Sequence, residues 1–249
     1  MNLNFLVAPD FSPERFAGWH LLNTFLQRKS DLALRLLTPA SASEQAALVA
    51  EGKADIIYAN PFDAASMIRD SGYVALVKPV EKSNEVVIAT RSDSPLASIR
   101  DLQPGTRVAL TDNRDVKLVG LRLVEPADLT EADITWQVVE SYQAAARQAI
   151  QGNVDVCFLL AEAYHSLSRL TKTQLRPLVE SHIADISHVL LVHPRIVQEA
   201  DKLAGALLGM KGSADGQPVL DELGIPNGFV AMDAEEAEFM IDLMDTLLE

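Results

Sequence analysis

Cysteine is almost absent from this 249-residue chain, in which Cys157 is the only one. A single cysteine excludes an intramolecular disulfide and a cysteine-based metal site within one chain. The chain also lacks G-x-S-x-G, P-loop, G-x-G-x-x-G and H-E-x-x-H patterns, and its five histidines show no metal-ligand spacing. We therefore expect no metal and no cofactor. Because Cys157 lies inside an apolar segment, we expect an inert buried thiol there.

Runs of basic residues are absent too. The chain has 21 Lys and Arg against 35 Asp and Glu, which gives a formal net charge of −14. Nucleic acid and anionic membranes are bound through clustered Lys and Arg, so the sequence predicts neither partner. A small anionic ligand stays open, because nearby helix ends and one or two cations set the field of a pocket.

Long apolar runs are the third absence. No segment approaches the roughly 20 apolar residues that span a bilayer, so no membrane insertion is expected. The chain opens directly with an apolar strand pattern at Leu3–Val7, and no basic region with an apolar stretch precedes it. Two localisations follow from this: a periplasmic protein whose signal peptide has been removed, or a cytoplasmic protein.

What is present is the composition of a globular protein, with 48% hydrophobic and 22% charged residues and a length that allows two lobes. Apolar periodicity predicts strands that alternate with helices, which favours parallel pairing in an α/β fold. The strands are expected at 3–7, 32–37, 55–59, 86–90, 107–110, 134–139, 156–160 and 189–192. The helices are expected at 14–27, 43–51, 94–102, 142–151, 194–210 and 234–248.

One pattern occurs twice. Residues 47–59 and 147–160 both read as a helix, a glycine (Gly52 or Gly152), two residues, an aspartate (Asp55 or Asp155) and an apolar strand. The glycine can end a helix in the left-handed conformation, and a continuously apolar strand is buried on both faces. Any α/β protein can contain such a turn, but one copy in each half favours two lobes of similar build.

The order of several short motifs resembles the phosphonate and phosphate substrate-binding proteins of ABC transporters. They include Gly18-Trp19, the two glycine–aspartate turns, Ala59-Asn60-Pro61, Gly72-Tyr73, Arg91–Pro95, Asp101-Leu102, Val219–Ile225 and Gly228–Val230. The resemblance implies an α/β, two-lobed type 2 periplasmic-binding-protein-like fold with an interlobe ligand cleft. It also implies a solute-binding protein that serves an ABC permease, is not an enzyme and is a monomer.

The resemblance further implies that the chain crosses twice between the lobes, near Lys82–Val86 and near Ser181–His188. The expected lobes are residues 1–84 plus 186–249 and residues 85–185.

Loops that follow strands are the expected binding positions, because open α/β sheets bind ligands beyond the carboxyl ends of their strands. Helix starts in such loops present free N–H groups, and neutral side chains add hydrogen bonds. Helix capping is the alternative reading for Ser12, Asn60 and Ser141, and a core position is the alternative for the tyrosines. The candidate ligand-binding residues are Asp10, Phe11, Ser12, Tyr58, Asn60, Thr111, Asn113, Arg114, Ser141, Tyr142 and Glu162.

The sequence departs from the phosphonate binders that it resembles after the strand at 107–110. Those proteins carry a Ser/Thr-rich turn with glycine there, whereas this chain has Thr111-Asp112-Asn113-Arg114-Asp115-Val116-Lys117. Asp112 and Asp115 would repel a phosphonate dianion unless they face solvent or pair with Arg114 and Lys117. We therefore expect a small polar or singly anionic solute.

Two other functions stay open at this point. A cytoplasmic or sensor-linked regulatory module of the same fold would agree with the missing signal-peptide pattern. An enzyme on this fold would need an acid or base in the cleft, and Glu140, Glu162 and His165 are the residues placed to serve.

Overall fold

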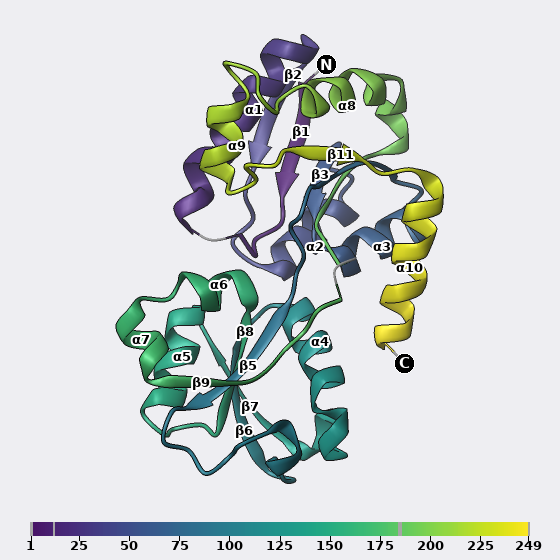
Figure 1. Cartoon of the computed structure of the whole chain (residues 1–249). Coiled ribbons are helices and arrows are strands. Elements are labelled where there is room, and N and C mark those ends of the chain that lie inside the picture. The colour runs from purple at the N-terminus through teal and green to yellow at the C-terminus, as the bar shows by residue number, and fades with distance from the viewer. Residues whose placement is uncertain (1, 12, 184–185, 249) are drawn as a thin grey trace. The chain divides into compact units, whose positions relative to one another are not determined.

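The computed structural model describes residues 2–11, 13–183 and 186–248. The chain divides into two compact units (Figure 1). The first comprises the residues up to Ser83 together with Ser187–Thr246, and the second comprises Asn84–Ile186 with the last residues of the chain. The sequence places the lobe boundaries at 84/85 and 185/186. Residues 184–185, inside the second expected crossing, lie outside the described residues.

The first unit contains a six-stranded sheet in the order β11-β4-β10-β3-β1-β2. Its strands are β1 (Asn2–Val7), β2 (Ala33–Leu37), β3 (Ile56–Ala59), β4 (Val74–Pro79), β10 (Val189–Val192) and β11 (Phe229–Ala231). β1 pairs in parallel with β2 and β3, whereas β10 runs antiparallel to β3 and β4, and β11 antiparallel to β4.

The second unit contains a five-stranded sheet in the order β7-β6-β8-β5-β9. Its strands are β5 (Val86–Arg91), β6 (Thr106–Thr111), β7 (Ile134–Val139), β8 (Val156–Leu160) and β9 (Leu175–Glu180). β6 pairs in parallel with β7 and β8, and β5 runs antiparallel to β8 and β9.

Both sheets follow one plan. The order β2-β1-β3-β10-β4 in the first unit corresponds to β7-β6-β8-β5-β9 in the second. In each sheet one strand runs antiparallel to both of its neighbours, namely β10 in the first unit and β5 in the second. Each is the first strand after the chain passes from one unit to the other. The predicted parallel pairing therefore holds for the strands joined by crossover helices and is wrong for β5 and β10, which no crossover helix precedes.

Helices connect the strands and pack on the sheets. The first unit contains α1 (Phe16–Ser30), α2 (Ala42–Ala50), α3 (Pro61–Ser71), α8 (Ala200–Leu208), α9 (Gln217–Leu223) and most of α10 (Ala234–Leu248). The second contains α4 (Arg114–Val124), α5 (Tyr142–Ile150), α6 (Ala161–Ser166) and α7 (Arg169–Thr173). Among the described residues, no helix combines the length and the apolar character needed to cross a membrane.

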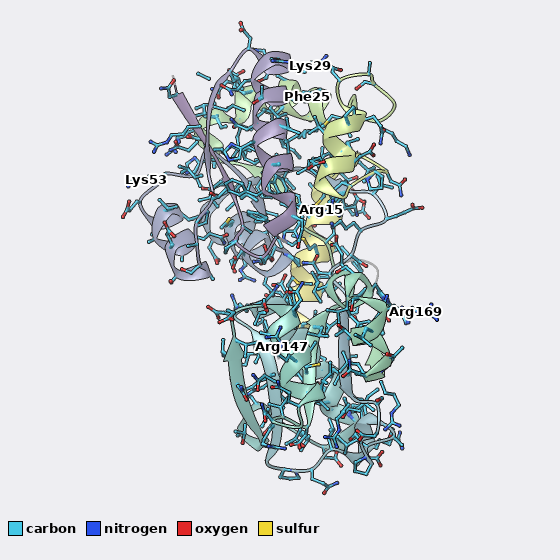
Figure 2. The ribbon with its side chains drawn as sticks, turned by 90° about the vertical axis from the view of Figure 1, so that its left-hand side faces the viewer. Arg15, Phe25, Lys29, Lys53, Arg147 and Arg169 are labelled. Atoms are coloured by element: carbon cyan, nitrogen blue, oxygen red, sulfur yellow. The ribbon has the colours of Figure 1, made fainter. Side chains whose placement is uncertain are left out.

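The core of the first unit forms where α1 packs against β1 and β3. Trp19, Leu22 and Leu26 of α1 are buried with Phe5 of β1 and Ile56 of β3. Phe25 of α1 belongs to the same core, and Figure 2 shows it near Lys29 on this helix. The Lys29 ammonium lies 5.5 Å from the centroid of the Phe25 ring and pairs with Asp215.

The repeated glycine–aspartate turn has the same hydrogen bonds in both units. Asp55 accepts from the backbone N–H of Asn4 at 2.8 Å, and Asp155 accepts from that of Arg107 at 2.8 Å. An arginine clamps each carboxylate, Arg195 at 2.7 Å from Asp55 and Arg107 at 2.7 Å from Asp155. The same arginines also donate to a carbonyl of the turn, that of Gly52 or Asn153. Each aspartate therefore ties the start of a buried strand to its neighbour.

Two predicted helices differ from the structure. Residues 94–102 form a loop with one 3-10 turn at Ile99–Asp101, because Asp101 accepts the N–H groups of Ala97 and Ser98 and so closes a single capped turn. The helix expected at 194–210 is divided into a 3-10 segment, Pro194–Glu199, and α8. Ile196, whose φ of −124° is not helical, lies inside the 3-10 segment.

Candidate ligand-binding site

The carboxyl ends of β1 and β3 bring together the predicted residues of the first unit. Asp10 and Phe11 follow β1, and Asn60 follows β3. Because Val189 of the antiparallel β10 pairs with Ala59, the residue before β10, His188, reaches the same edge of the sheet. Ser12, which the sequence also assigns to this site, lies outside the described residues.

Asp10 and His188 form an ion-pair arrangement at this edge. The Nε2 atom of His188 lies 3.1 Å from Oδ1 and 3.0 Å from Oδ2 of Asp10, and the two side chains are 11% and 13% exposed. Burial opposes ionisation of Asp10, but the charge and hydrogen bond of His188 outweigh it and hold the pKa of Asp10 below its ordinary value of 3.8. The carboxylate is therefore ionised at neutral pH.

An aromatic series continues from His188 into the core. The Tyr58 ring stacks on the imidazole of His188 with 4.9 Å between centroids, and the Trp19 ring lies 4.7 Å from that of Tyr58. Phe11 contacts Trp19 edge to face, with centroids 6.0 Å apart. Tyr58 is only 5% exposed. It therefore supports His188 from below and has the buried character that the core reading of the tyrosines predicts.

Asn60 has a structural role at the start of α3. Its side-chain oxygen accepts the N–H of Asp63 at 2.9 Å, which caps α3. Its amide donates to Oδ2 of Asp63 at 2.9 Å, and Gln45 donates to the same oxygen at 2.6 Å. The capping reading therefore accounts for Asn60, which is half-buried beside the other residues of this edge.

In the second unit, the ends of β6 and β7 bring Asn113 and Tyr142 into contact. The Asn113 amide donates to the Tyr142 hydroxyl at 3.0 Å, and the Asn113 oxygen caps α4 by accepting the N–H of Val116. Ser141 caps α5 by accepting the N–H of Ala144 at 3.1 Å. Thr111 lies at the end of β6, and its buried hydroxyl has no hydrogen-bond partner among the described residues.

The charged residues around the start of α4 differ in environment. Asp112 and Arg114 are exposed, whereas Asp115 is fully buried in the first turn of α4 and accepts a 3.1 Å hydrogen bond from Asn84. Lys117 pairs with Glu131 and lies 5.1 Å from the Trp136 ring centroid. A buried carboxylate in the first turn satisfies the positive end of the helix dipole from within the protein.

Glu162 differs from most of the other candidates in its exposure to solvent. It is exposed in the first turn of α6, directly after β8. Sequence reasoning did not select His188, Asn84 or Glu85. All three lie just before β10 or β5, and only the antiparallel insertion of these two strands moves them to the carboxyl ends of their neighbours.

Glu85 ties the segment before β5 to the one after β9. Its carboxylate accepts from the Ser181 hydroxyl and from the N–H of Ile183, the latter at 3.1 Å. The N–H of Asn84 donates to the carbonyl of Ile186 at 2.5 Å. Two strand-connecting segments distant in sequence are therefore held side by side.

The residues considered for acid–base chemistry do not form a constellation of that kind. Glu140 is exposed, and His165 Nε2 lies 2.8 Å from Glu180 Oε1 on the surface. Burial raises the pKa of the Cys157 thiol to about 12, which keeps it protonated. Among the described residues, no three His, Cys, Asp or Glu side chains are grouped to hold a metal ion.

Residues 5–237 match the model of one protein family, described as the periplasmic substrate-binding protein of a phosphonate ABC transporter. No curated protein matches the chain.

Solved structures share its fold. XAC2383 from Xanthomonas citri, bound to chloride ion, has a TM-score of 0.81 at 15% identity, over 99% of this chain and 98% of that one. PhnD1 from Prochlorococcus marinus (MIT 9301), in complex with methylphosphonate, has a TM-score of 0.81 at 10% identity with the same coverage. The periplasmic aliphatic sulphonate binding protein SsuA from Escherichia coli has 0.64 at 16%, over 99% and 86%. The predicted two-lobed periplasmic-binding-protein fold is confirmed.

Proposed function

This chain belongs to the family of periplasmic substrate-binding proteins of phosphonate ABC transporters, and we propose that its solute is small and polar or singly anionic. Capture of a solute for ABC transport is the function of this family, which is not a family of enzymes. Delivery to a membrane permease and a periplasmic location are part of the proposal. The family match supports both.

The observation that carries the proposed ligand charge is the start of α4. The solved structure of PhnD1 is a complex with methylphosphonate, and this chain shares its fold at 10% identity. Here, however, the first turn of α4 contains the buried carboxylate of Asp115, and the exposed Asp112 lies just before it. A dianion beside these carboxylates would be repelled, whereas hydroxyl and amide groups bind neutral or singly charged oxygens without that cost.

We propose that each unit carries ligand-binding residues at the carboxyl ends of its parallel strands. In the second unit, Asn113 and Tyr142, which are already in contact, supply neutral hydrogen-bonding groups. The first unit contributes an aromatic and ionic edge built on Asp10 and His188. The proposed ligand-binding residues stay those of the sequence, namely Asp10, Phe11, Ser12, Tyr58, Asn60, Thr111, Asn113, Arg114, Ser141, Tyr142 and Glu162, and His188 joins them.

Calorimetric titration with methylphosphonate, acetate, nitrate and glycerol tests the ligand charge. We expect methylphosphonate to bind weakly, and the Asp112→Asn/Asp115→Asn double variant to bind it about tenfold more tightly, since one repulsion of about 1.4 kcal/mol is tenfold in affinity. Asp128→Asn is the matched control, because it removes one charge from an exposed residue beyond the far end of α4.

The single variant Asp112→Asn keeps the test valid if the buried substitution impairs folding. Tight binding of methylphosphonate by the unchanged protein, retained in Arg114→Ala, would contradict the proposed ligand charge.

A further inference from the structure

A cavity of about 450 Å³ opens in the second unit at the edge of the sheet opposite to the candidate site. Its walls come from the end of β5, the start of β6 and the turn before β8. β6 and β8 run parallel, and β5 runs antiparallel to β8. The end of β5 therefore lies at the same edge of the sheet as the starts of β6 and β8. Thr106 lines the cavity, and Thr111 of the candidate site is at the other end of the same strand, roughly 16 Å away.

One wall of this cavity is internally satisfied. The guanidinium of Arg107 donates to Asp155 through Nη2 at 2.7 Å and through Nε at 3.2 Å, and Nη1 donates to the carbonyl of Asn153 at 2.7 Å. All three nitrogens of Arg107 are therefore used. The opposite charges of Arg107 and Asp155 therefore balance on this wall.

Arg91 differs from Arg107 in having unused donors. Its Nε donates to Asp93, and its Nη1 and Nη2 have no hydrogen-bond partner among the described residues. The guanidinium lies against the turn at Gly152, where a Cβ would come within 3.0 Å of Nη1. Gly152, whose φ is +73°, therefore ends the helix and also leaves room for this side chain.

The remaining lining provides an acceptor and apolar walls. Oδ2 of Asp101 accepts the N–H groups of Ala97 and Ser98 at 2.8 Å each, whereas Oδ1 has no partner among the residues that the structure describes. The apolar walls are Pro95, Leu96, Pro104, Ala149 and Val154. A guanidinium with free donors, a free carboxylate oxygen and apolar walls thus line a single cavity.

We propose that this cavity is a second ligand site, and that it takes a small carboxylate that also carries a hydrogen-bond donor, such as a hydroxy acid or an amino acid. The planar guanidinium of Arg91 matches a carboxylate through two parallel N–H bonds. Oδ1 of Asp101 accepts from the hydroxyl or ammonium group of the same molecule. The volume lies within the range of small-molecule pockets. The site shares no residue with the candidate transport site.

Backbone amide NMR of the full chain, titrated with glycolate and with glycine, tests this proposal. We expect saturable shifts at Arg91, Gly105 and Gly152 with both probes. Ethylene glycol and methylammonium, which lack the carboxylate, should leave these amides unchanged. Arg91→Gln should weaken binding of both probes by more than about tenfold, because it removes both charge-assisted hydrogen bonds to the carboxylate.

Two further variants define the site. Arg91→Lys keeps the charge but loses the planar fork, so we expect it to bind more weakly than the unchanged protein. Arg100→Gln is the matched control, because Arg100 is an exposed arginine of the same segment that does not line the cavity. The proposal is overturned if neither probe shifts the cavity amides, if the shifts are confined to residues such as Thr111 and Ser141, or if Arg91→Gln binds normally. Tyr142→Phe tests the transport site separately and should leave these shifts intact.

Discussion

In both units a carboxylate that follows the first parallel strand reaches a side chain just before the inserted antiparallel strand. In the first unit Asp10 follows β1 and pairs with His188 before β10. In the second, Asp115 follows β6 and accepts from Asn84 before β5. The positions correspond, but one contact joins two titratable groups and the other joins a carboxylate to a neutral amide. The same backbone plan therefore supports two edges of different charge.

This difference has a physical consequence for each edge. A buried carboxylate paired with an imidazole depends on the protonation of both groups. A carboxylate that accepts from an amide depends only on its own protonation. The first edge is therefore the one whose geometry should respond to pH and to removal of a single partner.

The largest effect should come from breaking the ionic contact. Asp10→Ala leaves His188 beside an empty position, and we expect the free energy of unfolding to fall by about 3 kcal/mol, the range for a buried pair that loses one member. Urea denaturation measures the change, and the cycle with His188→Ala and the double variant isolates the pair. Additive single effects would show that the two side chains do not interact energetically.

The pH dependence of the same pair sharpens the comparison. The pKa of Asp10 lies below its ordinary value of 3.8, because His188 outweighs the burial that would raise it. A lowered pKa in the folded state stabilises the protein above pH 3.8, and this stabilisation disappears as the pH falls through the folded-state value. We expect the stability difference between the unchanged protein and Asp10→Asn to be present above pH 3.8 and to vanish in acid. A stability difference that persists in acid would contradict the lowered pKa of Asp10.

The two glycine–aspartate turns should separate by burial. Asp55 is 7% exposed and Asp155 is 36% exposed, although an arginine clamps each of them. We expect Asp55→Ala to cost about 3 kcal/mol and Asp155→Ala about 1 kcal/mol, because solvent screens the second pair. Hydrogen exchange in β3 and β8 reports each turn separately. Equal losses would show that the backbone bonds, and not the arginine pairs, dominate both turns.

The smallest effect should come from the helix caps. Asn60→Ala and Asn113→Ala each remove one N-cap, so we expect both to lower the free energy of unfolding by about 1 kcal/mol. Solute affinity should fall further in Asn113→Ala, which also loses the contact with Tyr142. The solute identified by the calorimetric screen provides this measurement. An affinity of Asn113→Ala equal to that of the unchanged protein would place Asn113 among purely structural residues.

Local patterns predicted much of the fold. The apolar runs at 3–7, 56–59 and 156–160 correspond to β1, β3 and β8, and both glycine–aspartate turns end a helix as expected. Apolar periodicity and helix-ending glycines act over a few residues, so one sequence is enough to detect them. The helix predicted at 94–102 is wrong. Pro95 suits a helix start, but the side chain of Asp101 closes a single capped turn instead.

The sequence by itself determined the two α/β halves, the absence of a cysteine-based site and the loops in which polar residues follow strands. Only the tertiary structure decided which of those residues meet. His188 and Asn84 reach the carboxyl ends of their neighbouring strands because β10 and β5 are inserted antiparallel, far from their partners in sequence. Pairing between strands more than 60 residues apart depends on the packing of the whole unit, and no local pattern encodes it.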